Sequence, residues 1–260
     1  MDEFQEKSNQ FLTDYGKPLL ISFGALFLIG AGWALLGQVR ASHEKEAQEK
    51  FALIERQYQK TKEGFDRADA DAKAAANAKT PPPKEDPAKP KATPKTGDLE
   101  KDYGTVVSQL EGFLNDNAKS GAGGLAALTL CQIYEGYKKN DLCLAALEKM
   151  SAIDSKSFIG LMLQTRRATA LADSNQCPKA REIWTGLAKI APSFMTQEMK
   201  LRTALCFEQE GQADQAKSLY AEIGSMRGTT PDDVAVKDAD RYMRYLQFKT
   251  PGAQVGKLEN

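Results

Sequence analysis

A run of 22 residues without a charged side chain, positions 18–39, constrains this chain more than any other feature of its sequence. About 20 apolar residues can cross the hydrocarbon core of a bilayer as a helix, in which each backbone polar group finds an internal hydrogen-bond partner. Lys17 and Arg40 flank the run, and Trp33 lies near its end, where indole rings favour the membrane interface. The sequence therefore predicts a transmembrane helix over residues 18–39, in preference to a helix buried in a protein core.

A cleaved signal peptide is the alternative interpretation of this run, because Val39, Arg40 and Ala41 loosely resemble a peptidase site. Signal peptides have a shorter apolar region, of about 7–15 residues, and a basic segment before it. Residues 1–17 instead contain four acidic residues beside two lysines, so an uncleaved anchor with a cytoplasmic N-terminal segment is favoured. Gly30 and Ala34 permit close pairing of such helices, which leaves a homo-oligomer open. The flanking charges alone do not decide the orientation, since long domains translocate largely regardless of charge.

Residues 40–65 are predicted to form an amphipathic helix, with Phe51, Tyr58 and Phe65 on its apolar face. Residues 66–98 then have no apolar side chain larger than Ala or Pro, and six of the eleven prolines fall between positions 81 and 94. We expect an Ala/Lys/Pro-rich linker here, whose Ala-rich start can extend the helix but whose Pro-rich part cannot be helical. The helices on either side, residues 42–65 and 99–115, are expected to pack together as an irregular first repeat.

Residues 99–248 show helical periodicity with an internal repeat of 36 to 37 residues. Each copy places small and large side chains in the same order, because antiparallel helices that cross closely need small residues at the crossing and large ones beside it. The period is near the 34 residues of tetratricopeptide repeats. The sequence thus predicts an all-α fold: a single N-terminal transmembrane helix followed by a tetratricopeptide-repeat-like helical solenoid. The aligned small positions are Cys131, Ala168 and Ala204, then Cys143, Ala180 and Ala216; the aligned large positions are Tyr134, Leu171 and Phe207, then Leu147, Trp184 and Tyr220, then Met150, Leu187 and Ile223.

A last helix is predicted from Thr230 to about Phe248 as the cap of the solenoid, since a hydroxyl, a proline and two acids open it. Its face toward the last repeat is expected to carry Val234, Tyr242, Tyr245 and Leu246. Residues 249–260 are expected to form a flexible tail.

Charge and histidine content exclude several functions. The 35 basic and 35 acidic residues leave a net charge of zero, which argues against nucleic-acid binding. His43 is the single histidine, and no phosphate-binding glycine loop or closely paired cysteine motif occurs. We therefore expect no catalytic residue, no cofactor and no metal site, and the chain is predicted not to be an enzyme.

Tetratricopeptide arrays bind partners on a concave face lined by the first helix of each repeat. The positions on that face, which we take as candidate partner contacts, are Leu128, Gln132, Glu135, Thr165, Thr169, Leu201 and Glu208. The alternative for each of these residues is an ordinary side chain that is solvated or packs against its neighbour.

The chain resembles the YfgM-type family of tetratricopeptide-like ancillary subunits of the bacterial Sec translocon. The residues that carry the resemblance are Phe11-Leu12, Gly16-Lys17, Gly32-Trp33 within the anchor, and GLAALTLCQIYEGYKKNDLCLAALEKM. The 66–98 insertion departs from the short connection of that family. The resemblance implies a bacterial inner-membrane protein with a periplasmic domain, associated with the Sec translocon and periplasmic chaperones. A tethered scaffold for cell-envelope assembly or stress signalling remains the alternative.

The four cysteines are predicted to form two disulfides in an oxidising compartment. Cys131 and Cys143 occupy the two small positions that face each other where the helices of one repeat cross. Cys177 opens the second helix of a repeat, and Cys206 lies late in the antiparallel helix that follows it. The alternative is four buried thiols that act as small apolar residues.

Overall fold

The computed structural model describes residues 2–77, 90–228 and 234–249, with the backbone alone for residues 2–37, 40, 77, 193, 194 and 249. The described residues are all-α, with no strand, which confirms the predicted fold class at this level. The chain divides into two compact units, Met1–Lys50 and Phe51–Asn260.

The first unit lies within α1 (Asp2–Asn77), which begins at the first described residue. The predicted membrane anchor, residues 18–39, falls almost entirely where side chains are not described. Among the residues that the structure describes, no helix has the length and hydropathy needed to cross a membrane. The anchor therefore stays a prediction.

The second unit opens with the rest of α1, which runs to Asn77 and so includes the first part of the expected linker. Its aromatic face packs on α2 (Leu99–Asp116), as the predicted first repeat requires. The ring centroids lie 5.9 Å apart for Phe51 and Phe113, 5.8 Å for Tyr58 and Tyr103, and 5.3 Å for Phe65 and Tyr103. Burial raises the pKa of Tyr103 to about 12, with smaller contributions from neighbouring groups.

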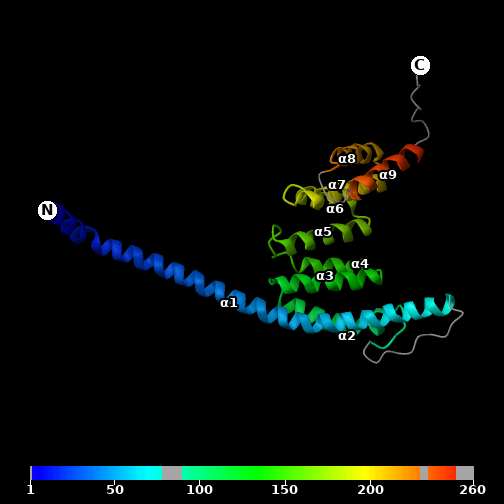
Figure 1. The fold of residues 1–260 in the computed structure, drawn as a ribbon, viewed down its shortest axis with the longest axis horizontal. Coiled ribbons are helices and arrows are strands. Elements are labelled where there is room, and N and C mark those ends of the chain that lie inside the picture. The colour runs from blue at the N-terminus through cyan, green and yellow to red at the C-terminus, as the bar shows by residue number, and fades with distance from the viewer. Residues whose placement is uncertain (1, 78–89, 229–233, 250–260) are drawn as a thin grey trace, which may run out of the picture. The chain divides into compact units, whose positions relative to one another are not determined.

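Seven further helices follow in the described part of the chain, each in contact with the next (Figure 1). In addition, α3 packs on α5, and α7 packs on α9. Their bounds are α3 (Gly121–Gly136), α4 (Asn140–Glu148), α5 (Phe158–Asp173), α6 (Cys177–Leu187), α7 (Ser193–Gln209), α8 (Ala213–Ser225) and α9 (Val234–Lys249).

The turns within three successive helix pairs share one backbone geometry. Lys138, Asn175 and Gly211 adopt the left-handed conformation, with φ of 58°, 59° and 75°. In each turn the amide of the next residue donates to a carbonyl five residues earlier, at 2.8 Å. This hydrogen bond closes the C-terminus of the first helix and reverses the chain into the second. The turn positions are 37 and 36 residues apart, which matches the sequence repeat.

The small side chains predicted at the helix crossings are all completely buried. Each of the six, Cys131, Cys143, Ala168, Ala180, Ala204 and Ala216, has 0% exposure. Eight of the nine large residues predicted beside them are buried too, among them Trp184 and Tyr220 at 1%, whereas Phe207 is only partly buried. The repeat pattern therefore predicted the packing of the core correctly.

Two helix starts approach the preceding turn so closely that only glycine fits. A Cβ on Gly123 would lie 2.0 Å from the carbonyl oxygen of Asn117, and one on Gly160 would lie 2.0 Å from that of Asp154. Ser120 and Ser157 cap the same helices by accepting from the amides of these glycines, at 2.9 and 3.0 Å. The two starts are 37 residues apart, so the repeat extends to its loops.

The capping helix α9 presents a different face to α8 from the one expected. Leu246 is buried, and Tyr242 stacks on Tyr220 with ring centroids 5.9 Å apart, as predicted. Val234 and Tyr245, however, are 58% and 55% exposed, so their prediction as packing residues was wrong. The buried face of α9 instead carries Ala235, Val236 and Ala239. The predicted helix start at residues 230–233 and the tail from 250 lie outside the described residues.

Candidate functional site

A groove of about 510 Å³ follows the first helices of the three regular pairs, α3, α5 and α7. Four of the seven candidate partner contacts line it: Leu128 and Gln132 from α3, and Thr165 and Thr169 from α5. These four positions were selected from the sequence repeat alone. The structure brings them together because successive first helices lie along the same side of the helix array. The other lining residues are Met162, Arg166, Met195, Glu198 and Arg202.

The groove combines apolar side chains with ion pairs at its edge. Leu128, Met162 and Met195 provide the apolar surface, and Met162 is 37% exposed. Arg202 Nε lies 2.8 Å from Glu198 Oε1 one turn earlier on α7. Arg166 forms an ion pair with Glu135, which links α5 to α3. Each arginine in the groove therefore has an acidic partner, and the surface between them is close to neutral.

Thr165 contributes a polar atom that the protein itself does not satisfy. Its Oγ1 is buried and has no hydrogen-bond partner in the described part of the chain. Its carbonyl accepts from Thr169 Oγ1 at 3.1 Å.

The remaining three candidate contacts have other roles. Leu201 is only 4% exposed and packs in the core with Ala204 and Tyr220, so its interpretation as an accessible contact is corrected. Glu208 accepts a hydrogen bond of 3.0 Å from the Tyr220 hydroxyl, which fixes it against α8. Glu135 pairs with Arg166 and points toward two cysteines.

The cysteines occur in the two pairs that the sequence predicts. Cys131 of α3 is bonded to Cys143 of α4, with Cα atoms 4.1 Å apart. Cys177 of α6 is bonded to Cys206 of α7, with Cα atoms 5.4 Å apart. All four are at most 2% exposed. The first bond closes one helix pair, whereas the second joins one pair to the next.

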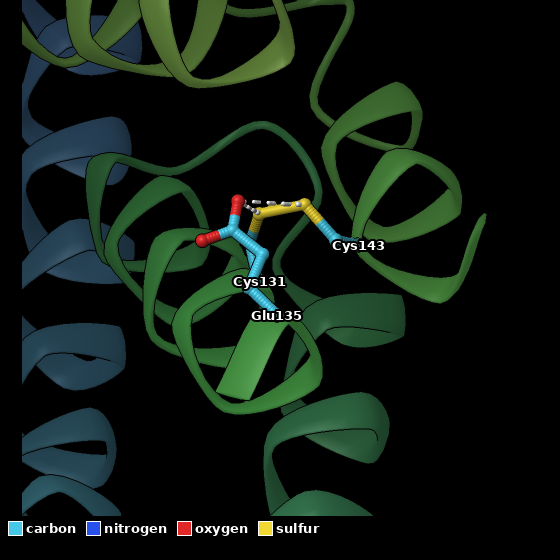
Figure 2. Close-up of side chains that lie close together, drawn as sticks. All are labelled: Cys131, Glu135 and Cys143. Carbon is cyan, nitrogen blue, oxygen red and sulfur yellow. Dashed lines mark hydrogen bonds between the residues drawn. A yellow bond between two sulfur atoms is a disulfide. The ribbon is translucent and has the colours of Figure 1, made fainter. Parts of the chain in front are cut away.

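Glu135 brings a carboxylate to the first disulfide (Figure 2). Its Oε1 lies 3.4 Å from Cys131 Sγ and 3.7 Å from Cys143 Sγ. Burial raises the pKa of Glu135 above its ordinary value, although the Arg166 guanidinium opposes this. The sequence predicts no metal site, yet these three side chains place ligand atoms within 4.8 Å of one another. The sequence signal was the spacing of four between Cys131 and Glu135, which puts both on one face of a helix.

A second polar centre, formed around Asp102, was not predicted from the sequence. This carboxylate is 8% exposed and accepts hydrogen bonds from the Thr96 amide and hydroxyl, the Gly97 amide and the Tyr137 hydroxyl, at 2.7 to 3.1 Å. Burial acts to raise the pKa of Asp102, but these hydrogen bonds outweigh it, so the pKa lies below its usual range. The network attaches the end of the linker to α2 and α3.

The same end of the linker also lies on α1. The Thr93 amide donates to the Gly64 carbonyl at 3.1 Å, and Arg67 Nη1 donates to the Pro90 carbonyl at 3.0 Å. Lys95 Nζ lies 4.5 Å from the centroid of the Tyr137 ring. Residues 90–98, which the sequence predicts to be part of the linker, therefore form a strap attached to α1, α2 and Tyr137.

The chain was compared with protein-family models, with curated proteins and with solved structures, and none of the three comparisons gave a match.

Proposed function

We propose that the chain is a membrane-tethered protein-interaction scaffold, which binds a polypeptide segment in the groove along α3, α5 and α7. The observation that carries this proposal is the convergence of Leu128, Gln132, Thr165 and Thr169 on one groove. No catalytic role is proposed for these side chains, since none of them is a nucleophile beside a base.

The helix array is proposed to be of the tetratricopeptide type. Support comes from the left-handed turn residues at intervals of 37 and 36, and from the buried small side chains at each helix crossing. Contacts between α3 and α5, and between α7 and α9, are of the kind that first helices make in a stacked array. In such arrays the first helices line the partner-binding surface.

The chemistry of the groove favours an apolar side chain of the partner as its occupant. Methionine has an unbranched, polarizable side chain that adapts to different shapes, which suits a surface that accepts more than one sequence. Met162 and Met195 lie here beside Leu128. The ion pairs at the edge, Arg166 with Glu135 and Arg202 with Glu198, offer polar partners to the backbone on either side. An unfolded or newly exported chain presents such apolar residues between polar backbone groups.

Tethering and compartment rest on the sequence. The uncharged run at 18–39 supports an inner-membrane anchor, with the N-terminus cytoplasmic and the second unit periplasmic. Two disulfide pairs are consistent with an oxidising compartment. Together with the resemblance to YfgM-type proteins, these features favour an ancillary subunit of the Sec translocon that assists exported proteins with periplasmic chaperones. A scaffold for cell-envelope assembly or stress signalling is the second candidate.

Site-specific photo-crosslinking in living cells tests this proposal. A photoreactive residue at Gln132, which is exposed in the groove, is compared with one at Ser218, an exposed residue of α8 that lines a separate depression. We expect a translocon or chaperone component to be crosslinked from position 132 and not from 218. Crosslinks at 132 to envelope-assembly proteins alone would favour the second candidate. Equal crosslinking from both positions would refute the groove as the binding surface.

A further inference from the structure

The cluster of Cys131, Glu135 and Cys143 is arranged as a set of metal ligands (Figure 2). In a tetrahedral zinc site with Zn–S of about 2.3 Å and Zn–O of about 2.0 Å, neighbouring sulfur and oxygen ligands lie roughly 3.5 Å apart. The two distances from Glu135 Oε1 to the cysteine sulfurs, 3.4 and 3.7 Å, bracket that value. Once the disulfide is reduced, the sulfurs need to separate only to about 3.8 Å, the spacing of two sulfur ligands in such a site.

The second oxygen of Glu135 already has a partner that would orient it. Oε2 pairs with Arg166 of α5, while Oε1 faces the sulfurs. Ligating carboxylates in metalloproteins are commonly held in this way by a hydrogen-bond donor behind them. The charges also balance, since two thiolates and a carboxylate are compensated by a divalent cation and the guanidinium.

The surroundings of the cluster suit a largely buried metal site with three protein ligands and a fourth coordination position left for water. Both cysteines are fully buried, whereas the Glu135 side chain retains 20% exposure, so solvent reaches the cluster at its carboxylate side chain. Two sulfur ligands and one oxygen suit Zn²⁺ and do not suit Ca²⁺ or Mg²⁺, which need more oxygen ligands. A water molecule would complete the tetrahedron.

We propose that Cys131, Cys143 and Glu135 bind one Zn²⁺ ion when the two cysteines are reduced, so that disulfide formation and metal binding are alternative states of this site. A cellular dithiol supplies the two electrons: the Cys131–Cys143 bond breaks, and the dithiol becomes a disulfide. The two thiols then release their protons to solvent as their sulfurs bind the metal. In an oxidising compartment the disulfide state prevails, and in reducing surroundings the metal state is accessible.

The second cysteine pair provides an internal control. Cys177 Sγ also lies 3.4 Å from a side-chain oxygen, but this belongs to the neutral amide of Gln209. Gln209 in turn donates to Asn175 at 2.8 Å, so it is engaged elsewhere. Without a carboxylate this pair lacks the third anionic ligand, and we expect it not to compete for the metal.

The test is a Co²⁺ titration of the full-length chain in detergent, reduced with a phosphine that is not itself a thiol ligand. Tetrahedral cobalt bound by thiolates absorbs in the visible and near ultraviolet, and Zn²⁺ should abolish the signal by displacement. We expect one ion per chain. Glu135→Gln should weaken binding by at least roughly 10-fold, and Arg166→Met should weaken it by about 10- to 100-fold, as loss of an orienting partner does elsewhere. The double variant Cys177→Ser/Cys206→Ser should bind as the unchanged chain does.

Four results would overturn the proposal. They are the absence of the cobalt signal from reduced, helical protein; an unchanged affinity in Glu135→Gln; a signal that follows Cys177 and Cys206 instead; and a reduced chain whose helical circular dichroism is lost and not restored by metal. The oxidised chain should give no signal, and a signal from it would equally refute the exclusive states.

Discussion

Replacing Asp102 with asparagine tests whether the strap at residues 90–98 is held by a charged hydrogen-bond centre. Asparagine has the same size, but an amide nitrogen replaces one acceptor oxygen. Oδ1 accepts from the Thr96 amide and hydroxyl, and Oδ2 accepts from the amides of Thr96 and Gly97 and from Tyr137. If Oδ1 is replaced, the Thr96 hydroxyl loses its acceptor while the Thr96 amide keeps Oδ2; if Oδ2 is replaced, the Gly97 amide and the Tyr137 hydroxyl lose theirs. Hydrogen bonds to a charged group contribute about 1.5–3 kcal/mol each, so we expect the free energy of unfolding to fall by at least about 1.5–3 kcal/mol.

The assay is urea unfolding followed by circular dichroism, with tryptic cleavage after Lys95 as a local measure. Asp98→Asn is the matched control, because Asp98 is an exposed helix cap and asparagine caps helices equally well. The folded-state pKa of Asp102 is lowered, so its stabilisation is present above the ordinary value of 3.8 and is lost as pH falls through the folded-state pKa. The difference in unfolding free energy between the unchanged chain and Asp102→Asn should therefore shrink as the pH falls below 3.8 and through the folded-state pKa. A difference within 1 kcal/mol of the Asp98→Asn control at neutral pH would refute this account.

Four further predictions use the whole chain. Carbonate washing of membranes should leave the full-length protein in the pellet with its N-terminus intact, and release would contradict the anchor at residues 18–39. Limited proteolysis should cut between Lys79 and Lys95, and the two fragments should stay together. The contacts of Phe51, Tyr58 and Phe65 with α2 would hold them, so rapid separation of the fragments would contradict that packing. Thiol trapping of protein taken directly from cells should find no free cysteine. Loss of the 131–143 bond in Cys143→Ala should lower the free energy of unfolding in denaturant by about 2–3 kcal/mol, as expected for a 12-residue loop. Gln132→Arg and Thr169→Arg should each reduce partner crosslinking without changing the helical circular dichroism, whereas Ser218→Arg should not reduce it. Equal effects of all three substitutions would count against the groove as the partner-binding surface.

The sequence predicted the buried pattern of the repeats well, because that pattern follows from local spacing. Cys131, Ala168 and Ala204 recur in register, and a close helix crossing needs a small residue at each. The turn residues Asn175 and Gly211 were also recognisable, since both residue types tolerate positive φ. Lys138 was not recognisable as their equivalent, because a lysine carries no such signal and adopts this conformation only under tertiary constraint.

Some features that depend on long-range contacts were not predicted. Asp102 meets Tyr137, 35 residues further on, and nothing in the local sequence of either announces the contact. The packing face of α9 was predicted only in part, since Tyr242 packs as expected but Val234 and Tyr245 do not. The small residues Ala235 and Ala239 in fact approach α8, and Val234 and Tyr245 turn outward. Four of the seven candidate contacts share the groove, whereas Leu201 lies one position away from that face and points into the core.

The different placement of the two disulfides determines how the second unit would respond to a pulling force. The Cys131–Cys143 bond removes twelve residues from the path of tension, about 40 Å of extended chain, and the Cys177–Cys206 bond removes twenty-nine, about 100 Å. The first bond keeps α3 and α4 together as one element, while the second fixes the junction between α6 and α7. The other described helices, α1, α2, α5, α8 and α9, carry no disulfide, so each can separate from its neighbours without a covalent bond being broken. A force applied between the two ends of the second unit would thus lengthen it through these helices, while α3 stayed joined to α4 and α6 stayed joined to α7.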